Sequence, residues 1–278
     1  MDDILASVGF PHNGTDEFAR LFMQVQQEGE IITTSEGIYY FWAIPTEVDW
    51  DIEIWLKSGH DGKSISIAPH FNGATSGVLE LQAGLRRPEG QHYDGGFRFD
   101  YFRFMERRAY VLKTPLVFDC PNFDCYADIT VPYKLNVQLC GVGAHLDCYE
   151  DEADYRARSG SPPYTEEDGL EFLMAADYIK NGELNLETMS PITYLTGRID
   201  ETQIVTNPIT GCDFIWSVVE IGNFGLIDVV APPDGLRGFM REGTIVKGTI
   251  LLSGRILGEP EAKEGAQETE PAKETGES

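Results

Sequence analysis

Leu195-Thr196-Gly197-Arg198-Ile199 and Leu252-Ser253-Gly254-Arg255-Ile256 stand near the two ends of one β-rich stretch, residues 191–257. Between them, short apolar runs alternate with turn residues such as Asn207-Pro208-Ile209-Thr210-Gly211, as in a small barrel. In such a barrel the first and last strands meet, a glycine relieves crowding at a bend, and an arginine stem lies along the barrel. The stretch therefore predicts an OB-like small β-barrel at 190–257. A chance recurrence of common β residues is the alternative.

If this barrel binds a ligand, the residues predicted to do so are Arg198, Phe214, Trp216 and Arg255. Barrel faces bind through aromatic and arginine side chains, which is why these residues are chosen. The same residues also suit packing in the core and along the strand edges. The sequence leaves both interpretations open.

The N-terminal part combines a helix with alternating strand patterns. Residues 15–28 predict a helix that Gly29 ends, with an apolar side formed by Phe18, Leu21, Phe22 and Val25. In residues 51–57, apolar Ile52, Ile54 and Leu56 alternate with Asp51, Glu53, Trp55 and Lys57. Such alternation is typical of an antiparallel sheet with one buried face and one wet face. Residues 30–112 therefore predict one mostly antiparallel sheet with the helix packed on it.

The alternation of apolar and polar residues becomes less regular after residue 113. A charged helix is predicted near 150–158, and a second helical candidate begins at Thr165, with a buried side of Leu170, Leu173, Met174 and Ile179. After Gly258 the chain holds seven glutamates and two lysines, a net charge of −5, and no aromatic or branched aliphatic residue. Such a segment cannot bury enough apolar surface to become ordered, so a disordered acidic tail is predicted.

These patterns together predict a β-rich α+β fold. We expect a helix-plus-antiparallel-sheet domain at 1–112 and a mixed connecting region with two helices at 113–189. The OB-like barrel at 190–257 and the acidic tail at 258–278 would follow.

The formal net charge of −25 restricts the partners. It argues against nucleic-acid backbones and anionic lipid surfaces, because both require clustered lysine and arginine. It favours a basic protein partner brought in by electrostatic steering. We find neither a signal sequence nor an 18-residue apolar run, and five cysteines without a signal suit a reducing compartment. We therefore expect a cytoplasmic protein without a membrane segment; the oligomeric state stays open.

Four cysteines are the nearest approach to a metal site. Cys120 and Cys125 form C-x4-C, and Cys140 and Cys148 form C-x7-C around His145, whereas zinc knuckles use C-x2-C. Cys140 and Cys148 share strand parity in an apolar run, where a free cysteine packs as a small hydrophobe. We expect buried thiols, no metal and no cofactor. Zinc, or a reactive thiol with His145 as base, is the alternative, and whether the four cysteines converge stays open.

Residues 86–113 are the one basic stretch, with a net charge of +3 and interleaved aromatic residues. Such a mixture can stack bases and hold phosphates. It is equally typical of an amphipathic edge strand, with Phe97, Phe99 and Tyr101 inward and Arg98 outward.

Because no catalytic motif stands out, the leading hypothesis is a non-catalytic binding or assembly protein with a protein partner. The first alternative is a hydrolase with a site around Asp119, His145 and Asp147. The second is a single-stranded nucleic-acid binder that uses residues 86–113.

Overall fold

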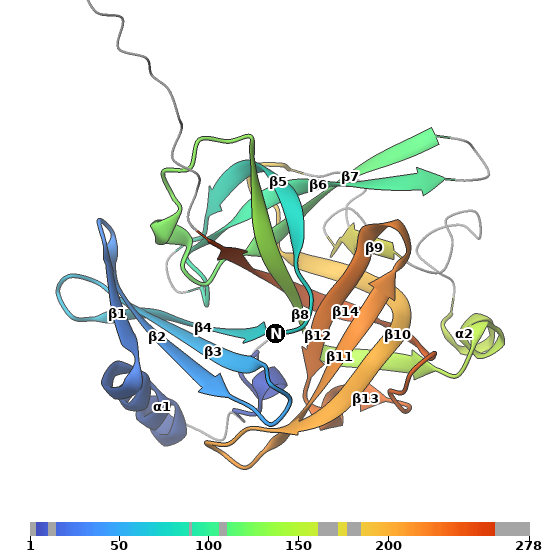
Figure 1. Ribbon diagram of the computed structural model, residues 1–278, viewed down its shortest axis with the longest axis horizontal. Helices are drawn as coiled ribbons and strands as arrows, with labels where there is room; N and C mark the ends of the chain where they lie inside the picture. The colour runs from blue at the N-terminus through green and yellow to red at the C-terminus, as the bar shows by residue number, and fades with distance from the viewer. Residues whose placement is uncertain are drawn as a thin grey trace, which may run out of the picture.

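The computed structural model describes residues 4–10, 15–88, 91–105, 110–160, 172–176 and 185–258. This part of the chain is β-rich and contains a four-stranded sheet and a ten-stranded sheet (Figure 1). The predicted acidic tail lies outside the described residues, except for Gly258.

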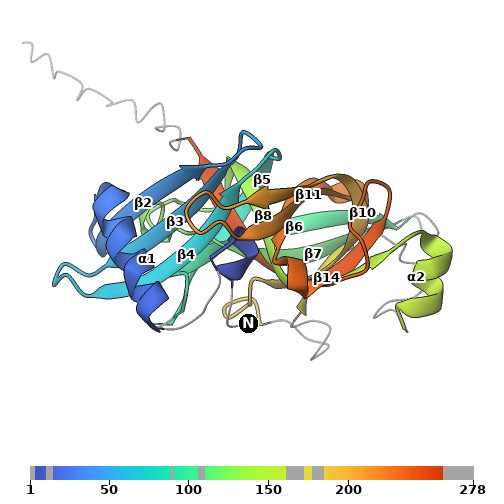
Figure 2. The ribbon, with the colours of Figure 1, turned by 90° about the horizontal axis from the view of Figure 1, so that it is seen from below.

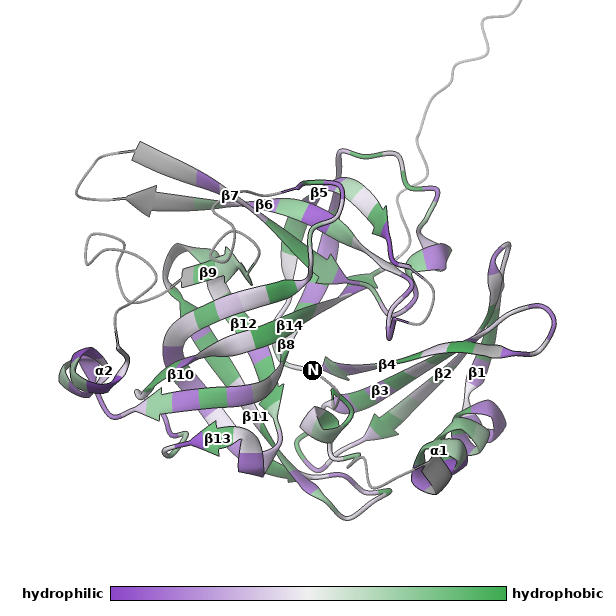
Figure 3. Cartoon of the chain, turned by 180° about the vertical axis from the view of Figure 1, so that it is seen from behind, coloured by the Kyte–Doolittle hydropathy of each residue, from purple (hydrophilic) through white to green (hydrophobic). Residues whose placement is uncertain are grey.

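Helix α1 spans Thr15–Glu28, as predicted. Leu21 and Val25 are buried, and Phe18 and Phe22 pack against the same core with their ring centroids 4.7 Å apart. Purple and green bands alternate along α1 in Figure 3, as expected for a helix with one apolar side. The helix contacts strands β2 and β3. A short 3-10 helix, η1 (Ala6–Val8), precedes it.

The four-stranded sheet has the order β1-β2-β3-β4 and is antiparallel throughout. Its strands are β1 (Glu30–Thr34), β2 (Gly37–Pro45), β3 (Asp51–Ser58) and β4 (Ser64–Asn72). Figure 2 shows this sheet and α1 at one end of the molecule, with the remaining strands at the other. The single sheet predicted for residues 30–112 is therefore wrong, because the strands that follow Asn72 pair with later parts of the chain.

The ten-stranded sheet contains the other strands. They are β5 (Gly77–Arg86), β6 (Gly95–Met105), β7 (Tyr110–Asp119), β8 (Tyr133–Tyr149), β9 (Phe172–Ala175), β10 (Ile192–Thr206), β11 (Asp213–Ile221), β12 (Gly225–Ala231), β13 (Leu236–Arg237) and β14 (Ile245–Leu257). Helix α2 (Glu152–Arg158) follows β8 where a helix was predicted, and Asp151 caps it by accepting a hydrogen bond from the Asp154 amide at 2.9 Å.

The strand pairings close two rings that share the antiparallel pair β8–β14 (Figure 1). The first ring runs β5-β6-β7-β14-β8, and its parallel contact between β7 and β14 is the single pair Asp119 and Ser253. The second ring runs β10-β11-β12-β8-β14 and contains one parallel pairing, between β12 and β8. The strands of 190–257 therefore do not close on themselves, because β8 lies between β12 and β14. The domain boundaries at 112 and 189 stay a prediction.

A β-bulge reverses the facing of β8 within the second ring. Its register against β14 shifts where Ile250 pairs with Gly143 and Thr249 pairs with His145. Because strand side chains alternate, the extra residue moves later side chains to the opposite face. Cys148 thus packs in the ring interior, whereas Cys140 packs toward the four-stranded sheet. The shared facing predicted for these two cysteines is wrong for this reason.

The repeated Leu-(Thr/Ser)-Gly-Arg-Ile sequence has the same burial in β10 and β14. Both leucines and both isoleucines lie in the buried apolar cluster inside the rings. A Cβ on Gly254 would lie 2.3 Å from the Phe118 ring, and one on Gly197 would lie 2.5 Å from the Glu220 carbonyl oxygen. Close packing at both glycines therefore favours a structural reason for the repeat.

Part of the helix predicted from Thr165 is a strand. Residues 172–175 form β9, which pairs with β10 and places Leu173 opposite Leu195. The apolar run satisfies its backbone in the sheet edge rather than in a helix. Residues 161–171 and 177–184 lie outside the described residues.

Candidate functional site

The face of β3 predicted to be wet is buried against the rings. Glu53, Trp55 and Lys57 are 0%, 2% and 6% exposed. Period-2 alternation identifies two chemically different faces, but it does not show whether water or another layer covers the polar one. Here the rings cover it, and its charged groups are paired. We call this contact the interlayer; it includes Glu53, Lys57, His70, Gln138, Asp228, Ser253 and Arg255.

His70 connects the two layers from near the C-terminal end of β4. Its Nδ1 lies 2.8 Å from the Ser253 hydroxyl of β14, and its Nε2 bonds the Gln138 side-chain oxygen of β8. Burial lowers the pKa of His70 to about 4, although the bond to Gln138 acts in the opposite direction. A neutral ring fits these contacts, because Nε2–H donates to Gln138 while Nδ1 accepts from Ser253.

Asp228 of β12 continues this chain of hydrogen bonds. Its carboxylate accepts from the Gln138 side-chain amide at 3.1 Å and from the Trp216 indole at 2.7 Å. It also accepts from the amides of Ala74 and Thr75 and from the Thr75 hydroxyl, at 3.0, 2.9 and 2.6 Å. Asp228 is fully buried, and these donors take the place of water. It thereby holds residues 73–76, which connect β4 to β5, against the second ring.

Arg255 of β14 reaches into the four-stranded sheet. Its guanidinium donates to Glu53, whose other oxygen accepts from the Trp55 indole at 3.0 Å. It also lies over the rings of Phe41 and Trp55, at 5.2 and 5.9 Å from their centroids. Burial lowers the pKa of Arg255, which remains a cation at neutral pH. A charged pair with aromatic support therefore joins the layers here.

A second polar cluster surrounds Lys57. Its ammonium group contacts Asp124 at 2.5 Å and Asp94 at 3.5 Å, and the Tyr39 hydroxyl lies 3.2 and 3.0 Å from oxygens of the same two carboxylates. Arg86 donates to the other Asp124 oxygen at 2.8 Å. Burial raises the pKa of Asp94; at Asp124 burial acts in the same direction, but Lys57 and Arg86 together hold its pKa below the ordinary value. Two cations thus balance two carboxylates in this cluster.

Asp119, from the hydrolase hypothesis, pairs with Arg87 at 2.6 Å. Burial raises the pKa of Asp119 to about 6, against the opposing charge of Arg87. Asp119 pairs with Ser253 of β14, and His145 pairs with Thr249 of the same strand. The two pairing positions are therefore four residues apart along β14. That separation is roughly 13 Å along the strand. His145 is exposed, and Asp147 contacts Arg237 at 4.0 Å, so the described contacts do not bring the three residues together.

The Ser253–His70 contact resembles the serine–histidine pair of nucleophilic enzymes. In such enzymes the serine oxygen must be reachable by a substrate carbonyl. Ser253 and His70 are both 0% exposed and lie between two packed layers. The geometry therefore supports a structural role, in which the pair holds β4 against β14.

Two of the predicted binding residues meet in the core. Phe214 and Trp216 on β11 both pack on Phe71 of β4, with centroid distances of 5.6 and 6.3 Å, and both are buried. Arg198 donates to the Gly243 carbonyl at 3.0 Å. It pairs with Ile245 across the sheet, ten residues along β14 from Arg255, which is roughly 33 Å. The structure therefore separates the two arginines.

The basic stretch contains an amphipathic strand. Phe97, Phe99 and Tyr101 are buried and Arg98 is half-buried, which confirms the predicted alternation. The predicted edge position is wrong, because this strand, β6, pairs with β5 on one side and with β7 on the other. Three other cations of this stretch are paired, Arg86 and Arg87 as given above and Lys113 with Asp100 at 2.8 Å. Residues 106–109 lie outside the described part, and nucleic-acid binding stays a hypothesis.

All five cysteines are free; Cys120, Cys140 and Cys148 are buried and Cys125 is exposed. Within the described ranges, we find no group of three or more His, Cys, Asp or Glu residues that could hold a metal ion. Likewise, no helix in the described part is long and apolar enough to cross a membrane.

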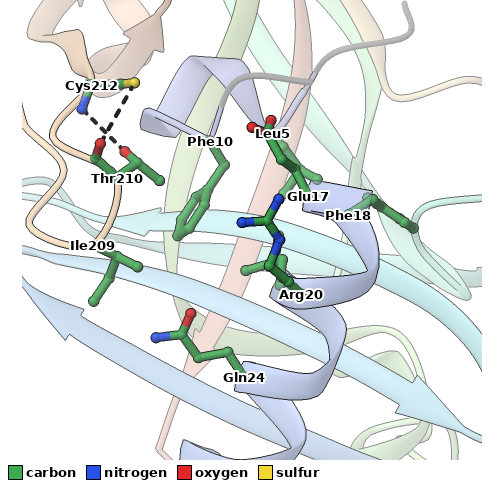
Figure 4. Close-up of a pocket in the computed structure, with 10 residues that line it drawn as sticks. Leu5, Phe10, Glu17, Phe18, Arg20, Gln24, Ile209, Thr210 and Cys212 are labelled. Atoms are coloured by element: carbon green, nitrogen blue, oxygen red, sulfur yellow. Dashed lines mark hydrogen bonds between the residues drawn. The ribbon is translucent and has the colours of Figure 1, made fainter. Parts of the chain in front are cut away.

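A solvent-facing cavity of about 360 Å³ lies between η1, α1 and the turn from β10 to β11. Figure 4 shows the Phe10 ring, Ile209, Gln24 and Arg20 around the same space. Leu5, Phe18 and Leu21 add apolar surface, while Thr210 and Cys212 line the turn side. We call this space the helix–turn cavity. It joins segments about 200 residues apart in the chain, which pattern analysis of one sequence does not bring together.

Hydrogen bonds hold the turn in place beside the cavity. The buried Asn207 side chain donates to the Val8 carbonyl at 2.8 Å and accepts from the Ile209 amide at 2.9 Å. The Thr210 hydroxyl donates to the Gly9 carbonyl at 2.6 Å. These bonds fix the turn side of the cavity wall. In the sequence, Asn207 is a turn-forming residue, and it was the one signal that could have indicated this part of the site.

Carboxylates lie close to the helix–turn cavity. Glu17 lines it, Glu47 accepts from the Thr206 amide at 3.3 Å, and Asp213 accepts from the Thr206 hydroxyl at 2.8 Å. Arg20 is the cation that lines it among the described residues. The cavity thus combines an apolar floor with one charge of each sign on its lining, and two further carboxylates bond the residue that precedes the turn.

Comparisons with protein-family models, curated proteins and solved structures find no match to this chain.

Proposed function

We propose that this protein is a non-catalytic binding protein that holds a positively charged protein segment in the helix–turn cavity. The observation that carries the proposal is the cavity itself, which has a volume of about 360 Å³ and an apolar floor. Glu17 and Arg20 line it, and Glu47 and Asp213 bond Thr206 next to the turn. Apolar contacts would supply affinity, and the carboxylates would select a basic partner.

Two further features support this proposal. The net charge of −25 would speed the approach of a basic partner. The buried ionisable groups of the interlayer have hydrogen-bonding partners within it, which gives them a structural use. The proposal retains the cytosolic setting expected from sequence, where five free cysteines stay reduced.

The proposal also includes an OB-like character for the second ring. The pairings of its five strands support this character. Four of the strands, β10, β11, β12 and β14, come from 190–257, and the fifth is β8. Under this proposal the helix–turn cavity lies at the end of the β10–β11 hairpin of that barrel.

Selection from a display library of linear 12-residue peptides on the intact chain tests the binding proposal. We expect enriched peptides to combine leucine or phenylalanine with lysine and arginine. Their affinity should fall at least tenfold in the double variant Glu17→Lys/Asp213→Lys. The matched double variant Glu220→Lys/Asp234→Lys changes the net charge equally at exposed positions away from the cavity and should lose less than threefold. Neutral or acidic peptides, or equal losses in both variants, would contradict the proposal.

A further inference from the structure

A second cavity opens where the two rings part. Along one edge of β8, β5 pairs with residues 133–137 and β12 pairs with residues 140–142. Between these pairings the starts of β5 and β12 diverge and leave a cavity of about 580 Å³. We call it the fork cavity. Its volume falls within the range of about 300–1,000 Å³ that is usual for small-molecule sites.

The lining of the fork cavity carries no charged side chain among the described residues. Its apolar surface includes Val78, Leu79, Val137, Leu139, Phe224 and Leu226. Phe224 is held in place by Tyr101 and Phe99, at centroid distances of 5.2 and 6.4 Å. The wall is therefore supported from behind and does not depend on a ligand for its position.

The mouth of the cavity exposes apolar surface that other residues leave uncovered. Val78 is 69% exposed and Leu226 is 47% exposed, and they stand on different strands, β5 and β12. Single exposed apolar side chains are ordinary, whereas exposed apolar side chains that together line one cavity are a feature of binding sites.

Three hydrogen-bond donors of the lining are already engaged. The amides of Ala74 and Thr75 and the Thr75 hydroxyl all donate to Asp228. They therefore have no unused donor to direct at a charged ligand. The chemistry of this cavity differs in this respect from that of the helix–turn cavity, which Glu17 and Arg20 line.

We infer that the fork cavity binds an uncharged small molecule with a hydrocarbon chain. A charged head group would find no counter-charge in the lining, and the net charge of −25 repels a carboxylate in particular. The hydrocarbon chain would cover Val137 and Leu139 and remove Val78 and Leu226 from water. This site is independent of the proposed protein-binding function.

Titration with Nile red, a neutral dye whose emission shifts to the blue in apolar surroundings, tests the inference. We expect saturable binding that weakens at least tenfold in Leu226→Asp and in Val78→Asp. Two controls place the same charge elsewhere: Ile204→Asp, at an exposed apolar residue of β10, and Ile209→Asp, in the helix–turn cavity. Both should change the affinity less than twofold. The thermal unfolding midpoint checks that each variant is folded.

Competition identifies the ligand class. Decanol should displace the dye at least tenfold more effectively than decanoate at neutral pH, since the two differ mainly in the charge of the head group. Absence of saturable binding, equal losses in the control variants, or equal displacement by decanoate would overturn the inference. Loss in Ile209→Asp alone would move the apolar site to the helix–turn cavity and would also contradict it.

Discussion

The ring interior and the interlayer are both shielded from water, but they are assembled from different chemistry. Leu81, Phe118, Val219 and Leu252 are among the apolar residues that fill the rings, and each is fully buried. In the interlayer, His70, Gln138, Asp228 and Ser253 are buried to the same degree and are joined by hydrogen bonds. Apolar packing tolerates substitutions that conserve volume, whereas a buried polar contact requires a particular partner in a particular place.

This difference explains how the two parts of the molecule are positioned relative to each other. Packing in the rings is controlled by size, as the contact between Gly254 and the Phe118 ring shows. The position of the four-stranded sheet is controlled by pairs from sequence-distant strands, including Glu53 with Arg255 and His70 with Ser253. We therefore expect substitutions in the two regions to respond differently to size, charge and pH.

The largest effect is expected from Asp228→Ala. It removes the acceptor of two buried donors, the Trp216 indole and the Gln138 side-chain amide, and also that of the partly buried amides of Ala74 and Thr75. The free energy of unfolding should fall by about 4 kcal/mol, measured by urea denaturation. Asp213→Ala, which removes an exposed carboxylate bonded to Thr206, should have at most a small effect. Similar values for both variants would show that the Asp228 contacts do not hold the layers together.

A substitution in the rings gives the apolar counterpart. Leu252→Ala should lower the free energy of unfolding by about 3 kcal/mol, because it removes buried methyl groups and leaves a cavity. Leu252 is fully buried and carries no titratable group, so this loss should be the same at pH 7 and pH 5. A strongly pH-dependent loss would contradict the assignment of Leu252 to an apolar core.

The interlayer should respond to acid through His70. Its pKa is lowered to about 4 from the ordinary 6.5, so between these values the unfolded chain binds more protons. The stability contributed by neutral His70 is thus present above pH 6.5 and is lost as pH falls toward 4. The stability gap between the native chain and His70→Gln should shrink by up to about 3 kcal/mol from pH 7 to pH 4.

The comparison with His70→Gln isolates one group from others that titrate. Asp119, with its pKa raised to about 6, contributes in the opposite direction as pH changes, because the folded state then binds the extra proton. Both chains contain Asp119, so its contribution cancels in the gap. A gap that stays constant with pH, as expected for Leu252→Ala, would contradict the role of His70.

The smallest effect is expected from Arg255→Lys. Lysine keeps the charge but loses the planar contact with Phe41 and Trp55 and the fixed geometry toward Glu53. We expect a loss of about 1 kcal/mol in thermal or urea unfolding. Arg198→Lys is the matched control from the repeated sequence. Arg198 donates to the Gly243 carbonyl and lies 3.6 Å from a Glu152 oxygen at the surface, so exchanging one cation for another there should be close to neutral. Equal losses would remove the distinction between the two arginines.

Local patterns predicted most of the elements. The 3.6-residue period of residues 15–28 predicted α1, and the alternation in residues 51–57 predicted β3. These elements are determined by residues close together in the chain. The same reasoning failed at residues 172–175, where pairing with β10 makes a strand from a run that also suits a helix.

The candidate sites could not be predicted, because they depend on strand pairing. The polar face of β3 has the composition of a wet face, and only its contacts with Arg255 and Asp124 show that it is covered. The bulge near His145 reverses the facing of Cys148 without a sequence signal. The helix–turn cavity joins Phe10 to Ile209, and no local pattern relates those positions.

A double-mutant cycle between Glu53 and Arg255 tests the central claim most directly, namely that the polar face of the four-stranded sheet is docked on the rings. The cycle compares Glu53→Gln, Arg255→Gln and the double variant by urea unfolding. We predict a coupling free energy of about 2 kcal/mol, because the pair is the charged contact between β3 and β14 in the part of the chain described. A coupling below about 0.3 kcal/mol would mean that the two residues do not interact and that this face is not docked as described.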